Sequence, residues 1–183
     1  MLVRAELEQI IHGKRGMLRG IDACLEQQCL VSAVTLIYAM LDALAALTRP
    51  RDATETSGAI FKDWVRRYSG LESGLNCSAD DLWGARCGVL HLHSPISRLS
   101  SQGKVKEIYY QWRHGPPAGA SLELPGEPIV VNVDDLHDLA LRAVDTFNKA
   151  VEADRELNDL VEHHLRHLLC YKPFTTLVHA HAA

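Results

Sequence analysis

The segment from Leu30 to Leu47, LVSAVTLIYAMLDALAAL, constrains the fold more than any other part of the sequence. It is long enough for about five helical turns, and it is rich in alanine and apolar on nearly every side, with Asp42 as its one charged residue. A helix that is apolar all round must be covered by neighbouring helices or by a second subunit. We therefore place this segment at the centre of a core built from helices.

Helical periodicity continues on both sides of this segment. Apolar residues recur at helical spacing over residues 2–25, with a bend expected near Gly16, and again from Asp134 onward, where they predict one long or two consecutive helices. With 183 residues, of which 47% are hydrophobic, the chain can bury one core. We predict a mainly all-α fold, an up-down helical bundle forming a single domain over residues 1–183, with a flexible tail at about 172–183.

Two shorter helices are predicted between these long ones. Residues 59–70, AIFKDWVRRYSG, place their apolar side chains on one side of an amphipathic helix that ends at a glycine. Ser78 and Asp81 form an S-x-x-D capping box at the start of the next helix, and Pro95 ends that helix. The second short helix therefore has a defined beginning and end.

Residues 97–133 form an insertion in the helical pattern. Aromatic and β-branched runs flank a stretch rich in glycine and proline, which predicts a small β-hairpin or an ordered loop around 105–133. Within it, YYQWRHG at 109–115 interleaves aromatic residues with Arg113, a combination that stacks on bases and contacts phosphates. A half-buried strand that packs its aromatic residues on the bundle gives the same pattern, and we favour that interpretation.

Charge and hydropathy exclude several classes of partner. A net charge of −4 gives no general attraction to nucleic acid, so an RNA would have to meet a local cluster such as the one containing Arg66 and Arg67. No charge-free apolar run reaches the roughly 18 residues that span a bilayer, so we expect a cytoplasmic protein without a membrane partner. Five cysteines without a C-x-x-C pair argue against disulfides and a cysteine-based zinc site.

Three histidines near the carboxyl terminus raise the question of a metal site. His163 and His167 are four residues apart and would share one helix face, with His164 beside them. Zinc normally takes three or four ligands, and the segment contains no H-E-x-x-H arrangement. We favour a solvated helix face and predict neither a metal nor a cofactor.

The capped helix carries the most informative motif, SADDLWGARCGVLHLHSP at residues 78–95. Arg86 and His91 are five residues apart, which places them roughly 140° apart around a helix, and we expect them to flank a groove. An arginine shaped for phosphate oxygens beside a histidine that exchanges protons near neutrality suffices for RNA cleavage by the 2′-hydroxyl, without a metal. The alternative is a structural arginine and a hydrogen-bonded histidine.

The motif LWGARCGVLH, preceded by the alanine-rich helix with its one acidic residue, YAMLDALAAL, resembles the HEPN superfamily (higher eukaryotes and prokaryotes nucleotide-binding). The signature of that family is an arginine, a short run of mostly apolar residues and a histidine, on a late helix of an all-helical bundle. The resemblance covers roughly Val31 to Ser94, and the insertion has no counterpart in the minimal bundle. It implies a HEPN-like fold.

The resemblance also implies a function and roles for three residues. Family members cleave RNA without a metal, in a cleft between two protomers, and act as toxins, defence effectors or RNA-processing enzymes. By motif position, Arg86 would bind the scissile phosphate, His91 would act as general base or orient the 2′-hydroxyl, and Asp42 would orient Arg86 or His91. The function expected is a metal-independent endoribonuclease.

The implied partners are RNA or a nucleotide, a second copy of the chain in a homodimer, and an antitoxin or another protein. We assign RNA contacts to His93, Arg66, Arg67 and Arg113. The sequence departs from the family pattern at Cys87, where nuclease members often carry a polar residue, and at His93, where toxin members regulated by adenylylation often carry a tyrosine. The alternative function is a non-catalytic HEPN-like dimeric module that binds nucleotide, RNA or a protein partner.

Overall fold

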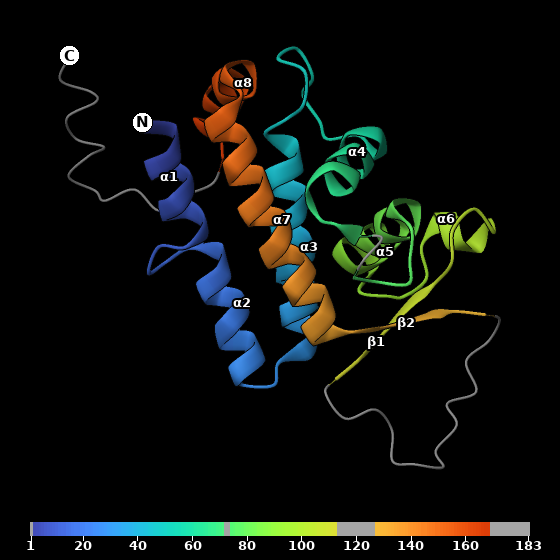
Figure 1. Ribbon diagram of the computed structural model, residues 1–183. Coiled ribbons are helices and arrows are strands. Elements are labelled where there is room, and N and C mark those ends of the chain that lie inside the picture. The colour runs from blue at the N-terminus through green and yellow to red at the C-terminus, as the bar shows by residue number, and fades with distance from the viewer. Residues whose placement is uncertain (1, 72–73, 113–126, 169–183) are drawn as a thin grey trace.

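Helices make up most of the computed structural model, which describes residues 2–71, 74–112 and 127–168 (Figure 1). In chain order, the elements are α1 Leu2–Ile11, α2 Met17–Glu26, α3 Leu30–Ala46, α4 Gly58–Tyr68, α5 Ala79–Leu92, α6 Arg98–Ser101, β1 Ile108–Gln111, β2 Ile129–Asn132, α7 Val133–Ala153 and α8 Arg155–Leu165. No helix in these ranges is long and apolar enough to cross a membrane. The tail predicted at 172–183 lies outside the described residues.

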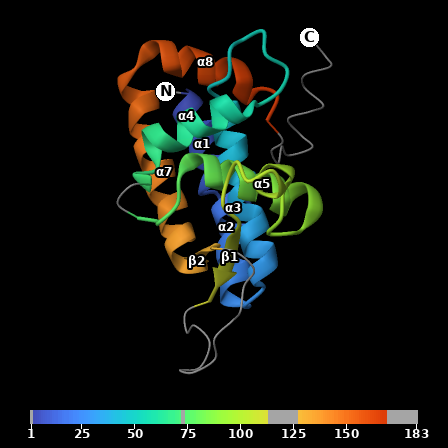
Figure 2. The ribbon, with the colours of Figure 1, turned by 90° about the vertical axis from the view of Figure 1, so that its right-hand side faces the viewer.

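The central position predicted for the alanine-rich segment is confirmed. α3 packs against α2, α4, α5 and α7, and Figures 1 and 2 show it among these helices, with Val31 and Leu36 72% and 39% exposed on the side that they leave open. Ile37, Tyr38 and Leu41 have no exposed surface, and Met40 is 1% exposed. Burial of such side chains contributes roughly 1.5–3 kcal/mol each. The small alanine side chains allow the neighbouring helices to approach α3 closely.

Both long periodic segments divide into two helices. At the amino terminus we expected one helix with a bend near Gly16, but α1 ends at Ile11 and α2 begins at Met17. Gly16 has extended backbone angles there, and a Cβ at Gly13 would lie 2.3 Å from the carbonyl oxygen of Gln9, so the glycines interrupt the helix. Towards the carboxyl terminus, the second of our two alternatives is confirmed: Asp154 caps α8 through its side chain and separates it from α7.

The predicted short helices form α4 and α5. Ser57 caps α4, and Ser78 and Asp81 form the predicted capping box of α5. Burial raises the pKa of Asp81, but its hydrogen bonds from Ser78 and from the backbone of Lys106 outweigh that effect and lower it. α5 ends at Leu92 before Pro95, as predicted. The capping network fixes the beginning of α5 and so helps to position the motif that the helix carries.

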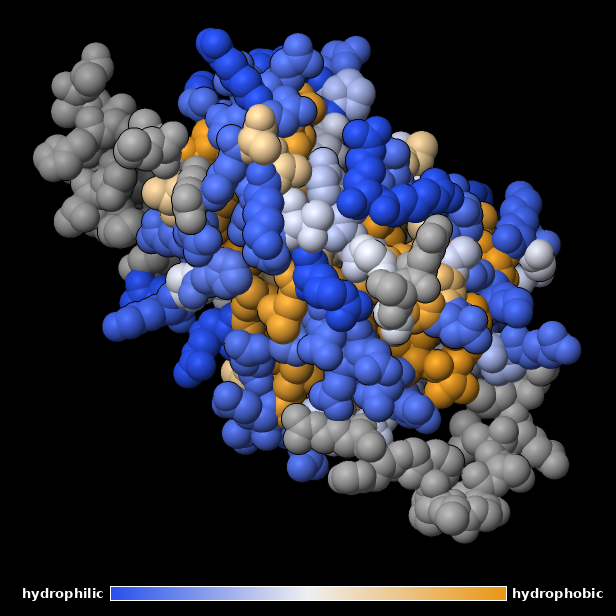
Figure 3. Space-filling view, in the orientation of Figure 1, coloured by the Kyte–Doolittle hydropathy of each residue, from blue (hydrophilic) through white to orange (hydrophobic). Residues whose placement is uncertain are grey.

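The predicted β-hairpin is wrong, because β1 and β2 run parallel, with Ile108 opposite Ile129. Residues 112–128 separate the strands, and a parallel pair requires a connection of a dozen or more residues instead of a tight turn. The half-buried strand interpretation of 109–111 is confirmed, since Tyr110 is partly buried and donates a hydrogen bond to the Tyr38 hydroxyl at 2.8 Å. Apolar residues gather over this sheet in Figure 3, while most of that face is hydrophilic.

Candidate functional site

The site is built where α3 and α5 pack against each other. Asp42 and Arg86 are 44 positions apart in the sequence, yet Arg86 Nε donates to Asp42 Oδ1 at 3.0 Å and Arg86 Nη2 donates to Asp42 Oδ2 at 2.6 Å. Two parallel charge-assisted hydrogen bonds of this kind fix the plane of a guanidinium as well as its position. Asp42 therefore orients Arg86 from the central helix.

Arg86 also contacts His91 directly. We expected the two side chains to flank a groove, because 140° separates them around the helix, but Arg86 Nη1 lies 2.9 Å from His91 Nε2. The expectation was wrong because it considered the directions of the Cα–Cβ bonds and not the length of arginine, whose guanidinium reaches around the helix. One guanidinium therefore joins the carboxylate on α3 to the imidazole on α5.

The chemistry of arginine fixes the protonation of His91 in this contact. A guanidinium carries only donors, so His91 Nε2 must be the acceptor, which requires an imidazole with its proton on Nδ1. The lone pair on Nε2 that would accept a proton in general base catalysis is thus held by Arg86. Any acceptor that takes over the Arg86 Nη1 donor leaves this lone pair free.

Exposure differs among the three residues. The side chains of Arg86 and Asp42 are 14% and 20% exposed, whereas His91 is open to solvent. Burial lowers the pKa of Arg86, but its hydrogen bonds and ion pair with Asp42 outweigh burial, so the pKa is raised. The site thus keeps a permanent cation just beneath the surface and a titratable group at the surface.

Two further residues of α5 surround Arg86. The Trp83 ring faces the guanidinium, with Arg86 Cζ 5.1 Å from the ring centroid, and Cys87 contributes a smaller effect that also raises the pKa of Arg86. Trp83 is not among the site residues predicted from the sequence. Its spacing of three residues before Arg86, on the same helix, is the signal that points to this contact.

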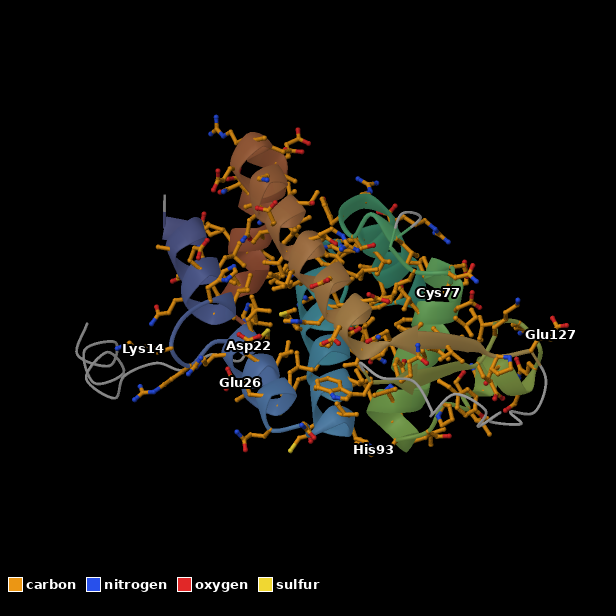
Figure 4. All side chains as sticks on the ribbon, turned by 60° about the horizontal axis from the view of Figure 1, so that its bottom comes forward. Lys14, Asp22, Glu26, Cys77, His93 and Glu127 are labelled. Atoms are coloured by element: carbon orange, nitrogen blue, oxygen red, sulfur yellow. The ribbon has the colours of Figure 1, made fainter. Side chains whose placement is uncertain are left out.

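The residues predicted to contact RNA lie in different surroundings. His93 caps the end of α5 in a left-handed conformation, exposed to solvent, and Figure 4 labels it there. Arg66 and Arg67 lie on α4, where Arg66 pairs with Asp80 on α5 and Arg67 pairs with Asp63, each at 2.9 Å. Arg113 lies outside the described residues. Among these four, His93 is the residue that shares α5 with Arg86 and His91.

The three carboxyl-terminal histidines do not meet at one point, although the rings of His163 and His164 pack edge to face, with centroids 4.8 Å apart. His164 is 2% exposed, and its Nε2 lies 2.9 Å from the carbonyl oxygen of Arg49. His167 is exposed beyond Leu165, the last residue of α8. Within the part of the chain that the structure describes, no three or more histidine, cysteine, aspartate or glutamate side chains are grouped to hold a metal ion.

Comparisons with known proteins add no relative to this description. No protein-family model matches the sequence, and no curated protein or solved structure matches it significantly. The resemblance to the HEPN superfamily therefore depends on the motif residues, and the site is interpreted from its own geometry.

Proposed function

We propose that the chain is a HEPN-like metal-independent endoribonuclease with Arg86 and His91 at its centre. The observation that carries the proposal is the joining of three predicted residues by one guanidinium: Arg86 bonds to Asp42 and to His91 at 2.6–3.0 Å. The motif and the acidic residue of the alanine-rich helix point to the same three residues without any distance. A chance pairing of an arginine and a histidine on one helix does not require a carboxylate from another helix to orient them.

The proposed reaction begins when the substrate replaces His91 as the hydrogen-bond acceptor of Arg86 Nη1. A phosphate of the RNA takes over the Nη1 donor of Arg86 and thereby frees His91 Nε2, which accepts the proton of the neighbouring 2′-hydroxyl. The 2′-oxygen forms a bond to phosphorus, and the bond from phosphorus to the 5′-oxygen breaks. The leaving 5′-oxygen takes a proton from water, and the hydroxide that remains takes back the proton from His91, so the products carry a 2′,3′-cyclic phosphate and a 5′-hydroxyl. Asp42 keeps the guanidinium in place throughout.

A homodimer in the cytoplasm, formed through the helix that carries Arg86, is part of the proposal. Leu92 is 63% exposed and Ile96 is 46% exposed, and both follow His91 closely in the chain. Large apolar side chains exposed beside a site are the kind of surface that a second subunit covers. Sedimentation of the natural protein and of Leu92→Ser should give a dimer and a monomer, respectively, and two monomers would remove this part of the proposal.

A second function is favoured by the burial of Arg86. Its side chain is 14% exposed, and its guanidinium already contacts Asp42, His91 and Trp83, as expected of an arginine that holds two helices together. In that case the chain is a HEPN-like dimeric module that binds nucleotide, RNA or a protein partner such as an antitoxin. The two functions differ in whether a substrate phosphate competes with His91 for Arg86.

Cleavage of an RNA pool separates the two functions. Single-stranded and structured RNAs are incubated in EDTA with the natural protein, Arg86→Ala and His91→Ala, and each variant is checked by circular dichroism and sedimentation. The endoribonuclease proposal expects 2′,3′-cyclic phosphate ends from the natural protein and a loss of at least about 100-fold in both folded variants. Cleavage that is absent, or equal in all three, contradicts it and favours the binding module.

A further inference from the structure

Trp83 is wedged between α4 and the Arg86 guanidinium. One neighbour is Phe61 on α4, whose ring centroid lies 5.4 Å from that of Trp83. Another is Gly58, where a Cβ would lie 2.7 Å from the indole Nε1. On α5 itself, Arg86 Cζ lies 5.1 Å from the Trp83 ring centroid. The indole therefore fills the space that the first turn of α4 leaves beside Arg86.

The contact between Trp83 and Arg86 restrains the guanidinium in a way that its hydrogen bonds do not. Asp42 and His91 take up N–H donors, which lie in the plane of the guanidinium. The guanidinium carbon lies over the face of the Trp83 ring, 5.1 Å from its centroid. The quadrupole of the ring attracts the cation, and the bulk of the ring limits movement of the guanidinium towards α4.

Trp83 differs in this respect from Trp64, the tryptophan of α4. Trp64 is 1% exposed and packs against Tyr68 and Phe147 in the core. Trp83 is only partly buried, and its neighbours are the site arginine and the first turn of α4. The two residues provide a matched pair in which one tryptophan supports the core and the other supports the site.

We propose that Trp83 is a positioning residue, which holds the Arg86 guanidinium in the position from which it reaches both Asp42 and His91. The consequence for catalysis rests on the proposed function, whereas the effect on Arg86 itself does not. Gly58 belongs to the same arrangement, because any side chain there displaces the indole. Trp83 does not contact the reacting atoms, but it keeps Arg86 Nη1 where the substrate phosphate replaces His91 as acceptor. Its loss should therefore lower kcat more than it raises KM.

Four single variants and the double variant of Trp83→Leu with Gly58→Ala test this proposal. Trp83→Leu removes the ring, Gly58→Ala pushes against it, and Trp64→Phe is the control that perturbs the core without touching Arg86. In each, NMR measures how fast the Arg86 Nε–H proton exchanges with water, a readout that needs no RNA. Where the natural protein cleaves RNA, kcat and KM are measured as well, and Trp83→Phe tests rescue by a smaller ring.

The expected result is exchange of the Nε–H proton about tenfold faster in Trp83→Leu and Gly58→Ala, as for a cation–π contact in a partly buried site. Gly58→Ala should not speed up this exchange further in the Trp83→Leu background, and Trp64→Phe should exchange at the rate of the natural protein. The kcat for RNA cleavage should fall about tenfold in Trp83→Leu and recover in Trp83→Phe. Unchanged exchange in both site variants overturns the proposal. A natural protein that leaves RNA intact while exchange responds as expected overturns the endoribonuclease function and keeps Trp83 as a positioning residue.

Discussion

The ends of α5 and α8 both carry histidines, yet their surroundings differ. His91, near the end of α5, is exposed and bonds to Arg86, which reaches Asp42 on α3. His164, in the last turn of α8, is buried against a backbone carbonyl, and His167 lies exposed beyond the helix. Sequence spacing alone offered both groups as candidate sites. The difference is that an acidic residue from a distant part of the chain meets the first group, while a neutral carbonyl meets the second.

The largest effect, on the rate of RNA cleavage, is expected from Arg86→Lys. This change keeps the positive charge on α5 but removes the planar guanidinium with its several N–H donors, and so sharpens the comparison. Lysine cannot bond to Asp42 through two parallel donors and to His91 at the same time. We expect RNA cleavage to fall about 100- to 1,000-fold, as for the loss of one oriented donor. The measurement is single-turnover cleavage, with Arg166→Lys on the α8 side as control. Equal cleavage rates for both variants would contradict a role for the guanidinium of Arg86.

Asp42→Ala should have the next largest effect, on stability. It leaves the partly buried Arg86 cation without its counter-ion, which costs about 3 kcal/mol in free energy of unfolding. Asp145→Ala is the control, because Asp145 pairs with Lys149 on the surface, where such a pair contributes less than about 1 kcal/mol. Urea unfolding measures both. A loss below about 1 kcal/mol in Asp42→Ala would show that Arg86 does not depend on its partner.

A smaller, pH-dependent effect is expected at α8. Burial lowers the pKa of His164, despite its hydrogen bond to the Arg49 carbonyl, and its Nδ1 is buried with no partner in the described ranges. Below about pH 6.5, the ordinary pKa of histidine, the unfolded chain therefore binds a proton that the folded protein resists. The stability that neutral His164 contributes is fully present above that pH and is lost as the pH falls towards the pKa of His164 in the folded protein.

Urea unfolding of the natural protein and His164→Gln between pH 7.5 and pH 5 checks this expectation. Glutamine can keep a donor to the Arg49 carbonyl and does not titrate in this range. The free energy of unfolding of the natural protein should fall more steeply than that of the variant, by no more than about 1.4 kcal/mol per pH unit. Parallel curves for the two proteins would show that His164 titrates as freely in the folded state as in the unfolded chain.

The smallest effect is expected from the double change His163→Ala and His167→Ala. The two side chains do not converge with a third ligand in the described ranges, and the contact that is lost is the edge-to-face packing of His163 on His164. The free energy of unfolding should therefore change by less than about 1 kcal/mol. Added zinc should leave the melting temperature unchanged in both proteins. A zinc-dependent rise in the natural protein that disappears in the variant would restore the metal interpretation of α8.

Features that depend on neighbouring residues were predictable from the sequence. The Ser78 and Asp81 capping box, the ends of α5 and the apolar character of α3 follow from local spacing. The parallel pairing of β1 and β2 was not predictable in this way, because local alternation specifies a strand but not its partner. The same limit applies to Arg66, whose pairing with Asp80 depends on how α4 packs against α5.

The candidate site shows the same division. Arg86, His91 and Asp42 came from a motif, but the contact between Arg86 and His91 depends on a side-chain conformation that residue spacing does not describe. The contact of Trp83 with Arg86 was not predicted, because aromatic residues at helical spacing usually pack in the core. Its role becomes visible only when α4 and α5 are packed together.

The most direct test of the account is the tautomer of His91, measured by ¹⁵N NMR of the imidazole at pH 8. If Arg86 donates to Nε2, the spectrum of the natural protein should show an unprotonated Nε2 and a protonated Nδ1, and Arg86→Ala should return to a mixture of tautomers. A proton on Nε2 in the natural protein would contradict the contact on which the site is built.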